Sequence, residues 1–149
     1  MEFITTTHTL TRRDVPPIHN LEIREGLEGL SPARIATLYR RAPLLRRPVD
    51  NPARLWEMFT QSTLVLTAWN GGNLVGIARI LSDGALFSYL CDLAVEPDVQ
   101  GLGVGKRLID EVLKRCAGTE LIVRDSDISS RFYAHLGFTQ VDNAWIKRS

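Results

Sequence analysis

The sequence has few of the residues that mark secreted, metal-binding or membrane-spanning proteins. It contains only two cysteines, Cys91 and Cys116, both in apolar surroundings, so we expect buried free thiols and no disulfide framework. Three histidines are scattered without HxxxH or HExxH spacing, which predicts that the protein holds no metal. No apolar run approaches the roughly 18 residues of a spanning helix, and no secretion signal is visible. We therefore expect a cytosolic protein with no membrane partner.

An excess of charge of one sign is also absent. The formal net charge is +1 over 149 residues, and no basic stripe is present to displace counterions from many phosphates, so nucleic acid is not an expected partner. The length is that of one ordinary domain. We expect residues 1–17, which are rich in Thr and end in two prolines, to form an N-terminal arm, and residues 18–149 to form the domain.

The order of the predicted elements indicates an α+β fold. Proline after an N-capping residue predicts helices that begin at Pro32 and Pro52. The other predictions are strands at 21–25, 63–69, 74–81, 85–95, 120–124 and 138–148, a long helix from Val104 and a short one within 129–137. Strands 85–95 and 120–124 flank a helix and must be parallel. We predict a mixed, mostly antiparallel central sheet with a parallel βαβ unit and flanking helices.

Three glycines alternate in QGLGVGK, residues 100–106, between a predicted buried strand and a long helix. Without Cβ atoms, Gly101, Gly103 and Gly105 would let an anion reach the unpaired amides at the helix N-terminus, where the helix dipole is favourable. The alternative is a tight connection that uses glycine for turn geometry alone. The spacing is neither GxxxxGK followed by Ser or Thr nor GxGxxG, which excludes two other nucleotide loops. We therefore predict a phosphate-binding loop.

Two segments carry a resemblance to a known family. DLAVEPDVQGLGVGKRLIDEVL resembles the acetyl-CoA motif of the GNAT superfamily of N-acetyltransferases, with Gln100, Gly103 and Gly105 at its pattern positions. SSRFYAHLGF, residues 129–138, resembles the second motif of the same family. The resemblance spans about residues 18–149 and implies a GNAT-like fold with acetyl-CoA as cosubstrate and no metal.

The resemblance also implies which residues contact the coenzyme. Backbone amides of the loop would hold the pyrophosphate, and the pantetheine would pair with the 85–95 strand where it splays from its parallel neighbour. Ser126 stands where many members carry Asn, so the polar contact with the pantetheine arm is expected to be weaker or rearranged. The expected coenzyme-binding residues are Leu93, Val95, Gln100, Gly101, Leu102, Gly103, Val104, Gly105, Lys106, Ser126 and Phe132.

Three residues are candidates for proton transfer. A lysine-like amine is protonated at pH 7, and Asp92 or Tyr89, on the strand that would line the cleft, could act as its base or lead to it through water. Asp92 has an alternative role as a buried acid paired with Arg79. The resemblance gives Tyr133 the role of the acid that protonates the CoA thiolate; the alternative, packing of the helix onto the sheet, suits Phe132 better.

The expected function is transfer of an acetyl group from acetyl-CoA to a primary amine by direct attack through a tetrahedral intermediate. The acceptor would be a small-molecule amine or a peptide amine, and a homodimer stays open. ARILSDG, residues 78–84, resembles a GNAT subgroup with arylalkylamine-acetylating members. Five arginines, at 40, 41, 46, 47 and 54, predict a solvated face or an acidic acceptor. The alternatives are a protein-lysine or N-terminal acetyltransferase and a non-catalytic acyl-CoA-binding regulatory module.

Overall fold

The computed structural model describes residues 18, 20–42, 44–125 and 131–149. In chain order its elements are β1 (Leu21–Glu25), α1 (Pro32–Arg41), α2 (Pro52–Thr60), β2 (Leu64–Asn70), β3 (Asn73–Ser82), β4 (Phe87–Val95), the 3-10 turn η1 (Pro97–Val99), α3 (Val104–Arg115), β5 (Glu120–Val123) and α4 (Phe132–His135). The arm predicted at residues 1–17 lies outside the described residues.

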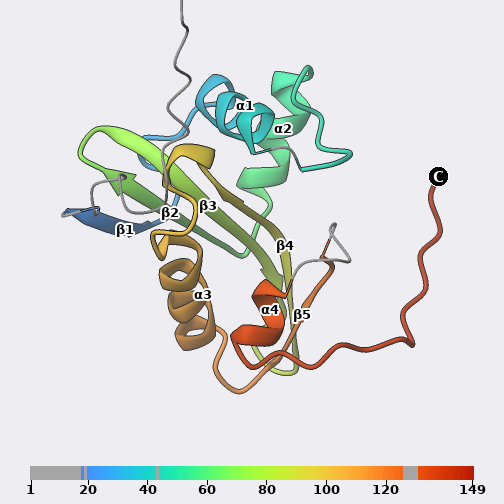
Figure 1. Cartoon of the computed structure of the whole chain (residues 1–149). Coiled ribbons are helices and arrows are strands. Elements are labelled where there is room, and N and C mark those ends of the chain that lie inside the picture. The colour runs from blue at the N-terminus through green and yellow to red at the C-terminus, as the bar shows by residue number, and fades with distance from the viewer. Residues whose placement is uncertain (1–17, 19, 43, 126–130) are drawn as a thin grey trace, which may run out of the picture.

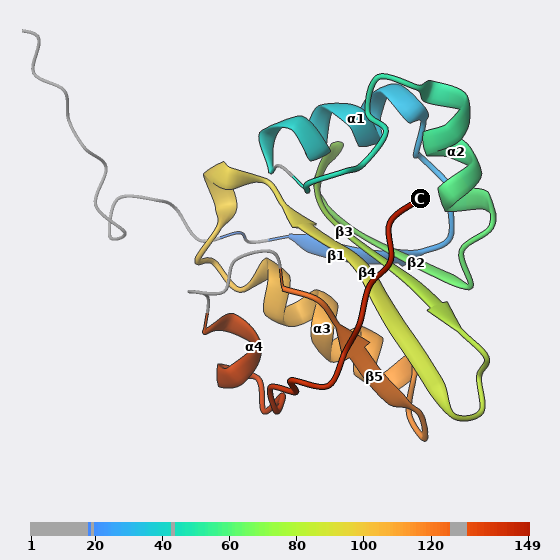
Figure 2. The same ribbon diagram turned by 90° about the vertical axis from the view of Figure 1, so that its right-hand side faces the viewer.

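The five strands form one mixed sheet in the order β1-β2-β3-β4-β5. Strands β1 to β4 are antiparallel neighbours, and β4 and β5 are parallel, as expected for a βαβ unit. Figures 1 and 2 show α1 and α2 against one face of the sheet, and α3 and α4 on the other. The predicted fold class is therefore confirmed.

Local capping explains where the two N-terminal helices begin. The Ser31 hydroxyl accepts a hydrogen bond from the Arg34 amide at 3.1 Å, and the Asn51 side-chain oxygen accepts one from the Arg54 amide at 3.2 Å. Each helix has proline in its first turn, where the missing N–H has no intrahelical partner to lose. Both helices start where their capping residues predicted.

Apolar residues fill both faces of the sheet. The cluster on the α3 face includes Leu66, Ile80, Leu90, Leu108, Ile109 and Val112, all almost fully buried. The cluster under α1 and α2 includes Ile35, Tyr39, Leu55, Phe59, Ile77 and Ala94. Different helices cover the two faces. A change in side-chain alternation along a strand therefore moves a side chain from the cluster under α3 to the cluster under α1 and α2, or the reverse.

One extra residue in β4 causes such a change. Arg79 pairs with Asp92, but the next residue of β3, Ile80, pairs with Leu90, so Cys91 is inserted. A bulge of this kind leaves the extra residue unpaired and offsets the period-2 alternation by one position.

The packing on either side of Cys91 agrees with this offset. Leu90 packs on the α3 face and Ala94 on the α1–α2 face, although an even spacing would keep them on one face of a regular strand. Tyr89 and Asp92 consequently share the α1–α2 face.

The structure corrects two predicted strands. Residues 138–149 contain no strand, and Trp145 is 98% exposed. The segment leaves α4 and runs outside β5 without joining the sheet (Figures 1 and 2). It carries Asp142 and Asn143, residue types that are rare in strands.

The other correction concerns the start of the 85–95 strand, which begins at Phe87. The amides of residues 85–87 donate to the Asp83 carboxylate at 2.8 to 3.1 Å and form a turn instead. The apolar sequence predicted that this end of β4 is covered on both faces. Phe87 is 47% exposed, so the prediction is wrong for this end.

Candidate coenzyme and acceptor site

Strands β4 and β5 separate halfway along β4. Their parallel pairing ends at Leu90 and Val123, and β4 continues to Val95 beyond the end of the shorter β5 (Figure 2). Within the part of the chain that the structure describes, residues 91–95 therefore have a strand neighbour only on the β3 side. We call this segment the open edge of β4.

Hydrogen-bond alternation determines which backbone groups face the open edge. The Glu96 amide donates to the Val75 carbonyl of β3 at 2.8 Å. Because antiparallel bonding alternates along a strand, the backbone groups of Leu93 and Val95 face away from β3. The side-chain amide of Gln100 donates to the Val95 carbonyl at 3.1 Å. Among the residues that the structure describes, this leaves the Val95 N–H and both polar groups of Leu93 for a ligand.

The glycine loop leads from the open edge into α3. Gly101 and Gly103 have φ angles of 83° and 87°, in the left-handed region that favours glycine, and a Cβ on Gly103 would meet nothing within 4 Å. The first intrahelical bond of α3 runs from the Arg107 amide to the Gly103 carbonyl at 3.0 Å. The amides of residues 104–106 therefore precede the helical ladder and can bind an anion.

Not every residue predicted for the loop offers an amide. The Gln100 and Leu102 amides donate to the carbonyls of Pro97 and Val99, each at 3.3 Å. The Val104 side chain is buried in the core, so only the backbone of that residue is available. The geometry thus supports an anion site with fewer amides than the predicted run from residue 100 to residue 106. The Lys106 ammonium lies 2.8 Å from Asp110, one turn further along α3.

Gly105 has a packing role that the sequence did not indicate. A Cβ atom there would lie 3.2 Å from Cζ of Phe132 and 3.7 Å from Cγ2 of Val95. The absence of a side chain lets α4 pack directly on the first turn of α3. Phe132 therefore lies beside the glycine loop, where the sequence predicted a coenzyme contact.

The ring of Tyr133, a residue of α4, packs against two other aromatic rings. Its ring centroid lies 5.1 Å from that of Phe132 and 5.4 Å from that of Phe138, both in edge-to-face geometry. The Phe138 amide donates to the Tyr133 carbonyl, and Gly137 has a φ of 88°, as predicted for the C′ position. Burial raises the pKa of the Tyr133 hydroxyl to about 12, and the Asp125 carboxylate adds to the increase.

Asp92 is fully buried and bound on both oxygens. Its Oδ1 accepts from Nε of Arg47 at 2.6 Å, and its Oδ2 accepts from Nε of Arg79 at 2.7 Å and from the Tyr39 hydroxyl at 2.8 Å. The side chain is 0% exposed. The ion pair with Arg79, which the sequence left as an alternative, is therefore present. Three hydrogen bonds and complete burial account for most of the acceptor capacity of this carboxylate, so the geometry favours a structural role for Asp92.

Tyr89 lies in the paired part of β4, before the open edge begins. Tyr89 is half-buried, directly opposite Leu81 of β3 and Ile122 of β5. Both cysteines are free, and burial raises the pKa of the Cys91 thiol, which keeps it protonated near neutral pH. Ser126 lies outside the described residues.

Sequence reasoning missed Arg47 and Tyr39 as members of this cluster. Of the five arginines grouped by sequence, four are exposed, as a solvated face predicts, but the Arg47 side chain is only 25% exposed. A buried carboxylate in an apolar strand needs more than one donor, and that requirement was the available signal. Burial and the neighbouring Asp92 carboxylate raise the pKa of Tyr39 well above its ordinary value.

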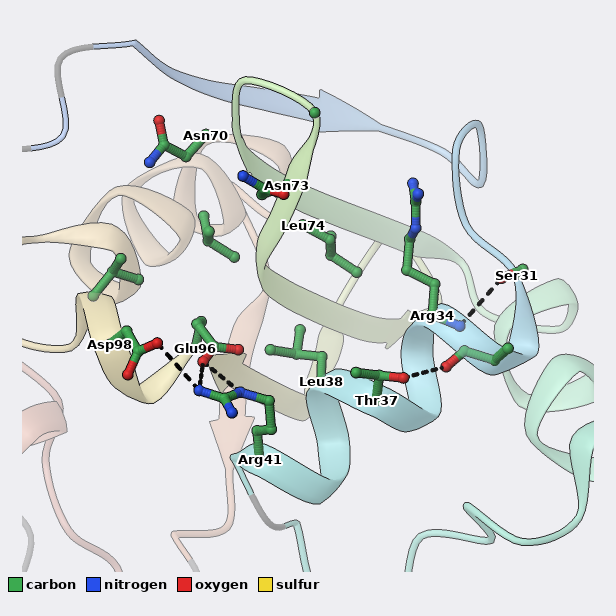
Figure 3. A pocket seen from close by; sticks show the side chains of 14 residues that line it. Ser31, Arg34, Thr37, Leu38, Arg41, Asn70, Asn73, Leu74, Glu96 and Asp98 are labelled. Carbon is green, nitrogen blue, oxygen red and sulfur yellow. Dashed lines mark hydrogen bonds and ion pairs between the residues drawn. The ribbon is translucent and has the colours of Figure 1, made fainter.

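A pocket of about 780 Å³ lies elsewhere, among α1, the β2–β3 hairpin and the segment after β4 (Figure 3). Its charged groups are paired: Arg41 reaches Glu96 and, at 3.2 Å, Asp98, while the Arg34 guanidinium binds the Gly29 carbonyl at 3.0 Å. The pocket borders β3 and the end of β4, away from the β5 side where the open edge lies.

Two further properties concern the described residues only. Among the residues that the structure describes, no three or more His, Cys, Asp or Glu side chains are arranged to hold a metal ion. Among the helices that the structure describes, none has the length and apolar character needed to cross a membrane.

Comparison with known proteins identifies the family. Residues 47–148 match the model of the acetyltransferase (GNAT) domain. The chain belongs to the GNAT family of acetyltransferases. Members of this family typically use acetyl-CoA as the acetyl donor.

Curated relatives share part of the chain. The histone acetyltransferase TAP1 of Glycine max is 39% identical over 69 residues, which cover 44% of this chain and 29% of the relative. Serotonin N-acetyltransferase 2, chloroplastic, of Oryza sativa subsp. japonica is 26% identical over 115 residues, 75% of this chain and 54% of the relative. The chain thus spans little more than half, or less, of these relatives. Because the rice relative is chloroplastic by name, the cytosolic location stays a prediction.

Solved structures confirm the fold. A GNAT family acetyltransferase of Streptococcus pneumoniae TIGR4 matches with a TM-score of 0.67 at 22% identity, covering 87% of this chain and 100% of the other. An aminoglycoside N-acetyltransferase solved in complex with CoA matches with a TM-score of 0.64 at 20% identity, covering 87% and 95%.

Proposed function

We propose that the protein is an acetyl-CoA-dependent N-acetyltransferase that acts on a primary amine by direct attack. One observation carries this proposal: the open edge of β4 continues into a left-handed glycine loop and the free first-turn amides of α3. A strand edge suits the amide-bearing pantetheine arm, and a helix N-terminus suits a pyrophosphate. The two features follow each other along the chain in the order in which the coenzyme presents these groups.

The coenzyme would be held mainly by the backbone. Pantetheine would pair with the N–H and carbonyl of Leu93, and the Val95 N–H would face the thioester carbonyl; both positions are set by the β3–β4 ladder. The pyrophosphate would bind the amides of residues 104–106 across Gly103. Phe132 would bound this site on the α4 side.

The acceptor amine must lose a proton before it attacks. Freeing the lone pair of an amine with a pKa near 10.4 costs about 4.6 kcal/mol at pH 7. Since both Asp92 oxygens are occupied, we assign proton removal to water oriented by the half-buried Tyr89 hydroxyl. Two arginines around one carboxylate give the neighbouring cluster a net charge of +1, which favours the neutral amine.

Collapse of the tetrahedral intermediate then breaks the C–S bond. The amine nitrogen has bonded to the carbonyl carbon, its extra proton leaves through water, and the oxyanion accepts from a backbone N–H of the open edge. The sulfur leaves with the bonding pair and takes a proton from Tyr133, and the resulting phenolate regains a proton from water. With the Tyr133 pKa at about 12 and a thiol near 8.5, this transfer is uphill by about 5 kcal/mol. That cost fits within the barrier of about 16 kcal/mol that corresponds to a turnover of about 10 s⁻¹.

Two observations bear on the class of acceptor amine. The names of the two relatives point to a protein substrate and to an arylalkylamine. The net positive cluster favours acceptors with a single ammonium group over polyamines and lysine-rich peptides. A small-molecule amine is therefore our first choice and a protein-lysine acceptor the second.

A panel of arylalkylamines, polyamines, amino acids and peptides, assayed by thiol release from acetyl-CoA, tests this function. We expect saturable turnover with at least one small primary amine. Acetyl-CoA binding without turnover on any member would support the non-catalytic acyl-CoA-binding module instead. Failure to bind acetyl-CoA at millimolar concentration would refute both.

A further inference from the structure

The bulge at Cys91 leaves a backbone carbonyl without a ladder partner at the start of the open edge. A partly buried carbonyl in this position is stabilised by a donor from outside the ladder. Nη2 of Arg47 donates to the Cys91 carbonyl at 2.7 Å, from a loop 44 residues earlier in the chain. The donor is therefore supplied by the segment between α1 and α2, residues 44–51, which we call the 44–51 loop.

The same guanidinium is held at two other points. Its Nε binds Oδ1 of Asp92 at 2.6 Å, and its Nη1 binds the carbonyl of Leu45, within its own loop, at 2.6 Å. Arg79 and Tyr39 both bind Oδ2 and leave Oδ1 to Arg47. Asp92 thus presents Oδ1 toward the loop. The planar guanidinium of Arg47 can donate to this oxygen and to the neighbouring Cys91 carbonyl at the same time.

We propose that Arg47 is a positioning residue that joins the 44–51 loop to the bulge of β4. The loop would form one wall of the acceptor side, because Arg47 brings it to the α1–α2 face at the point where the open edge begins. The buried Asp92 then serves as the anchor of this contact and not as the base. The part that concerns the acceptor rests on the proposed function; the contact itself does not.

Hydrogen–deuterium exchange on Arg47→Gln tests the contact without any turnover. We expect amides in residues 44–51 and at Cys91 and Asp92 to exchange at least tenfold faster than in the wild type, while those of α3 stay unchanged. The matched control is Arg46→Gln, the exposed neighbour, which should leave all of these rates unaltered. Unchanged exchange in the 44–51 loop of Arg47→Gln would overturn the proposal.

Kinetics then separate positioning from chemistry. Arg47→Gln should raise KM for the amine at least tenfold, change kcat by less than threefold and leave acetyl-CoA affinity within threefold. Arg47→Lys keeps the charge but cannot make the paired contacts, so it should shift exchange and KM in the same direction. Wild-type behaviour of Arg47→Lys in both readouts would show that charge alone suffices and would overturn the geometric role. If no amine is turned over, the proposed function fails while the exchange experiment still decides the contact.

Discussion

Gly105 lies under the ring of Phe132, so that a Cβ atom would come within 3.2 Å of Cζ, whereas a Cβ on Gly103, two residues earlier, would extend into open space. The two glycines therefore serve different needs in one motif. Gly105 allows α4 to approach α3, whereas in the proposed function Gly103 keeps the space above the helix N-terminus free for the pyrophosphate. Substitutions at the two positions should fail in different ways.

Gly103→Val should lower acetyl-CoA affinity at least tenfold, because its side chain occupies the space assigned to the pyrophosphate. The left-handed φ of 87° adds a cost of about 1–2 kcal/mol to stability. Gly118→Val is a matched control, since Gly118 has a φ of 86° and equally open surroundings beyond the C-terminal end of α3. Calorimetric titration with acetyl-CoA measures the difference. Equal affinity losses in both variants would attribute the effect to backbone strain alone.

Tyr133→Phe keeps the ring and its edge-to-face contacts but removes the hydroxyl. We expect kcat to fall roughly 10²-fold with little change in acetyl-CoA affinity, because the hydroxyl acts on the sulfur only in the transition state. Steady-state kinetics at saturating acetyl-CoA, with unfolding measured in parallel, gives the answer. Turnover within a few-fold of the wild type would leave Tyr133 with a packing role only.

Asp92→Asn should destabilise the fold by about 3–5 kcal/mol, because it leaves two arginines around a neutral group in a buried position. Urea unfolding measures this loss. If Asp92 were also the base, kcat/KM of the folded variant would in addition fall roughly 10²-fold or more, so turnover measured below the unfolding transition separates the two roles. Tyr89→Phe is the complementary variant, and we expect its main effect on turnover.

Stability should fall at alkaline pH because Tyr39 and Tyr133 both have raised pKa values in the folded state. Below pH 10 both phenols are protonated in the folded and unfolded chains, so their contribution is fully present. As the pH rises from 10 toward 12, the unfolded chain loses these protons first, and stability decreases. Urea midpoints between pH 9 and 11 should show a smaller decline for Tyr133→Phe than for the wild type. An identical decline in both proteins would contradict the raised pKa of Tyr133.

Trp145 should report on the segment after α4. It is 98% exposed, whereas Trp69 is 2% exposed and packs beneath Arg24. Acrylamide should therefore quench a solvent-exposed emission component that Trp145→Phe removes. A Trp145 emission that is shielded in the free protein would instead indicate that the segment packs on the domain, as the predicted strand required.

The sequence predicted the elements whose signals are local. Capping at Ser31 and Asn51, the turn between Asn70 and Asn73 and the amphipathic spacing of α3 all correspond to elements in the structure. These signals depend on neighbouring residues, and tertiary contacts did not override them. The strand predicted after Gly137 failed because a strand also needs a partner edge at the right place, which no local pattern specifies.

The candidate site was only partly predictable for a similar reason. The glycine loop is contiguous in sequence, so its position at a helix start could be predicted from its spacing. The partnership of Arg47 with Asp92 joins residues 45 positions apart, and the packing of Gly105 under Phe132 depends on how two helices meet. Both Asp92 and Tyr89 were predicted on the strand that lines the cleft. Their spacing of three would put them on opposite faces of a regular strand, and only the register with β3 shows that they share one.

Because Cys91 is an extra residue in β4, the strand depends on having a residue at this position more than on which residue it is. Removing Cys91 would restore regular alternation and would turn either Asp92 or Leu90 toward the wrong layer, so that a carboxylate would enter the apolar cluster on α3 or a leucine would leave it. Replacing Cys91 by Ser or Ala would keep the count and change little. Libraries of single-codon deletions should therefore lose function at position 91, where libraries of substitutions retain it.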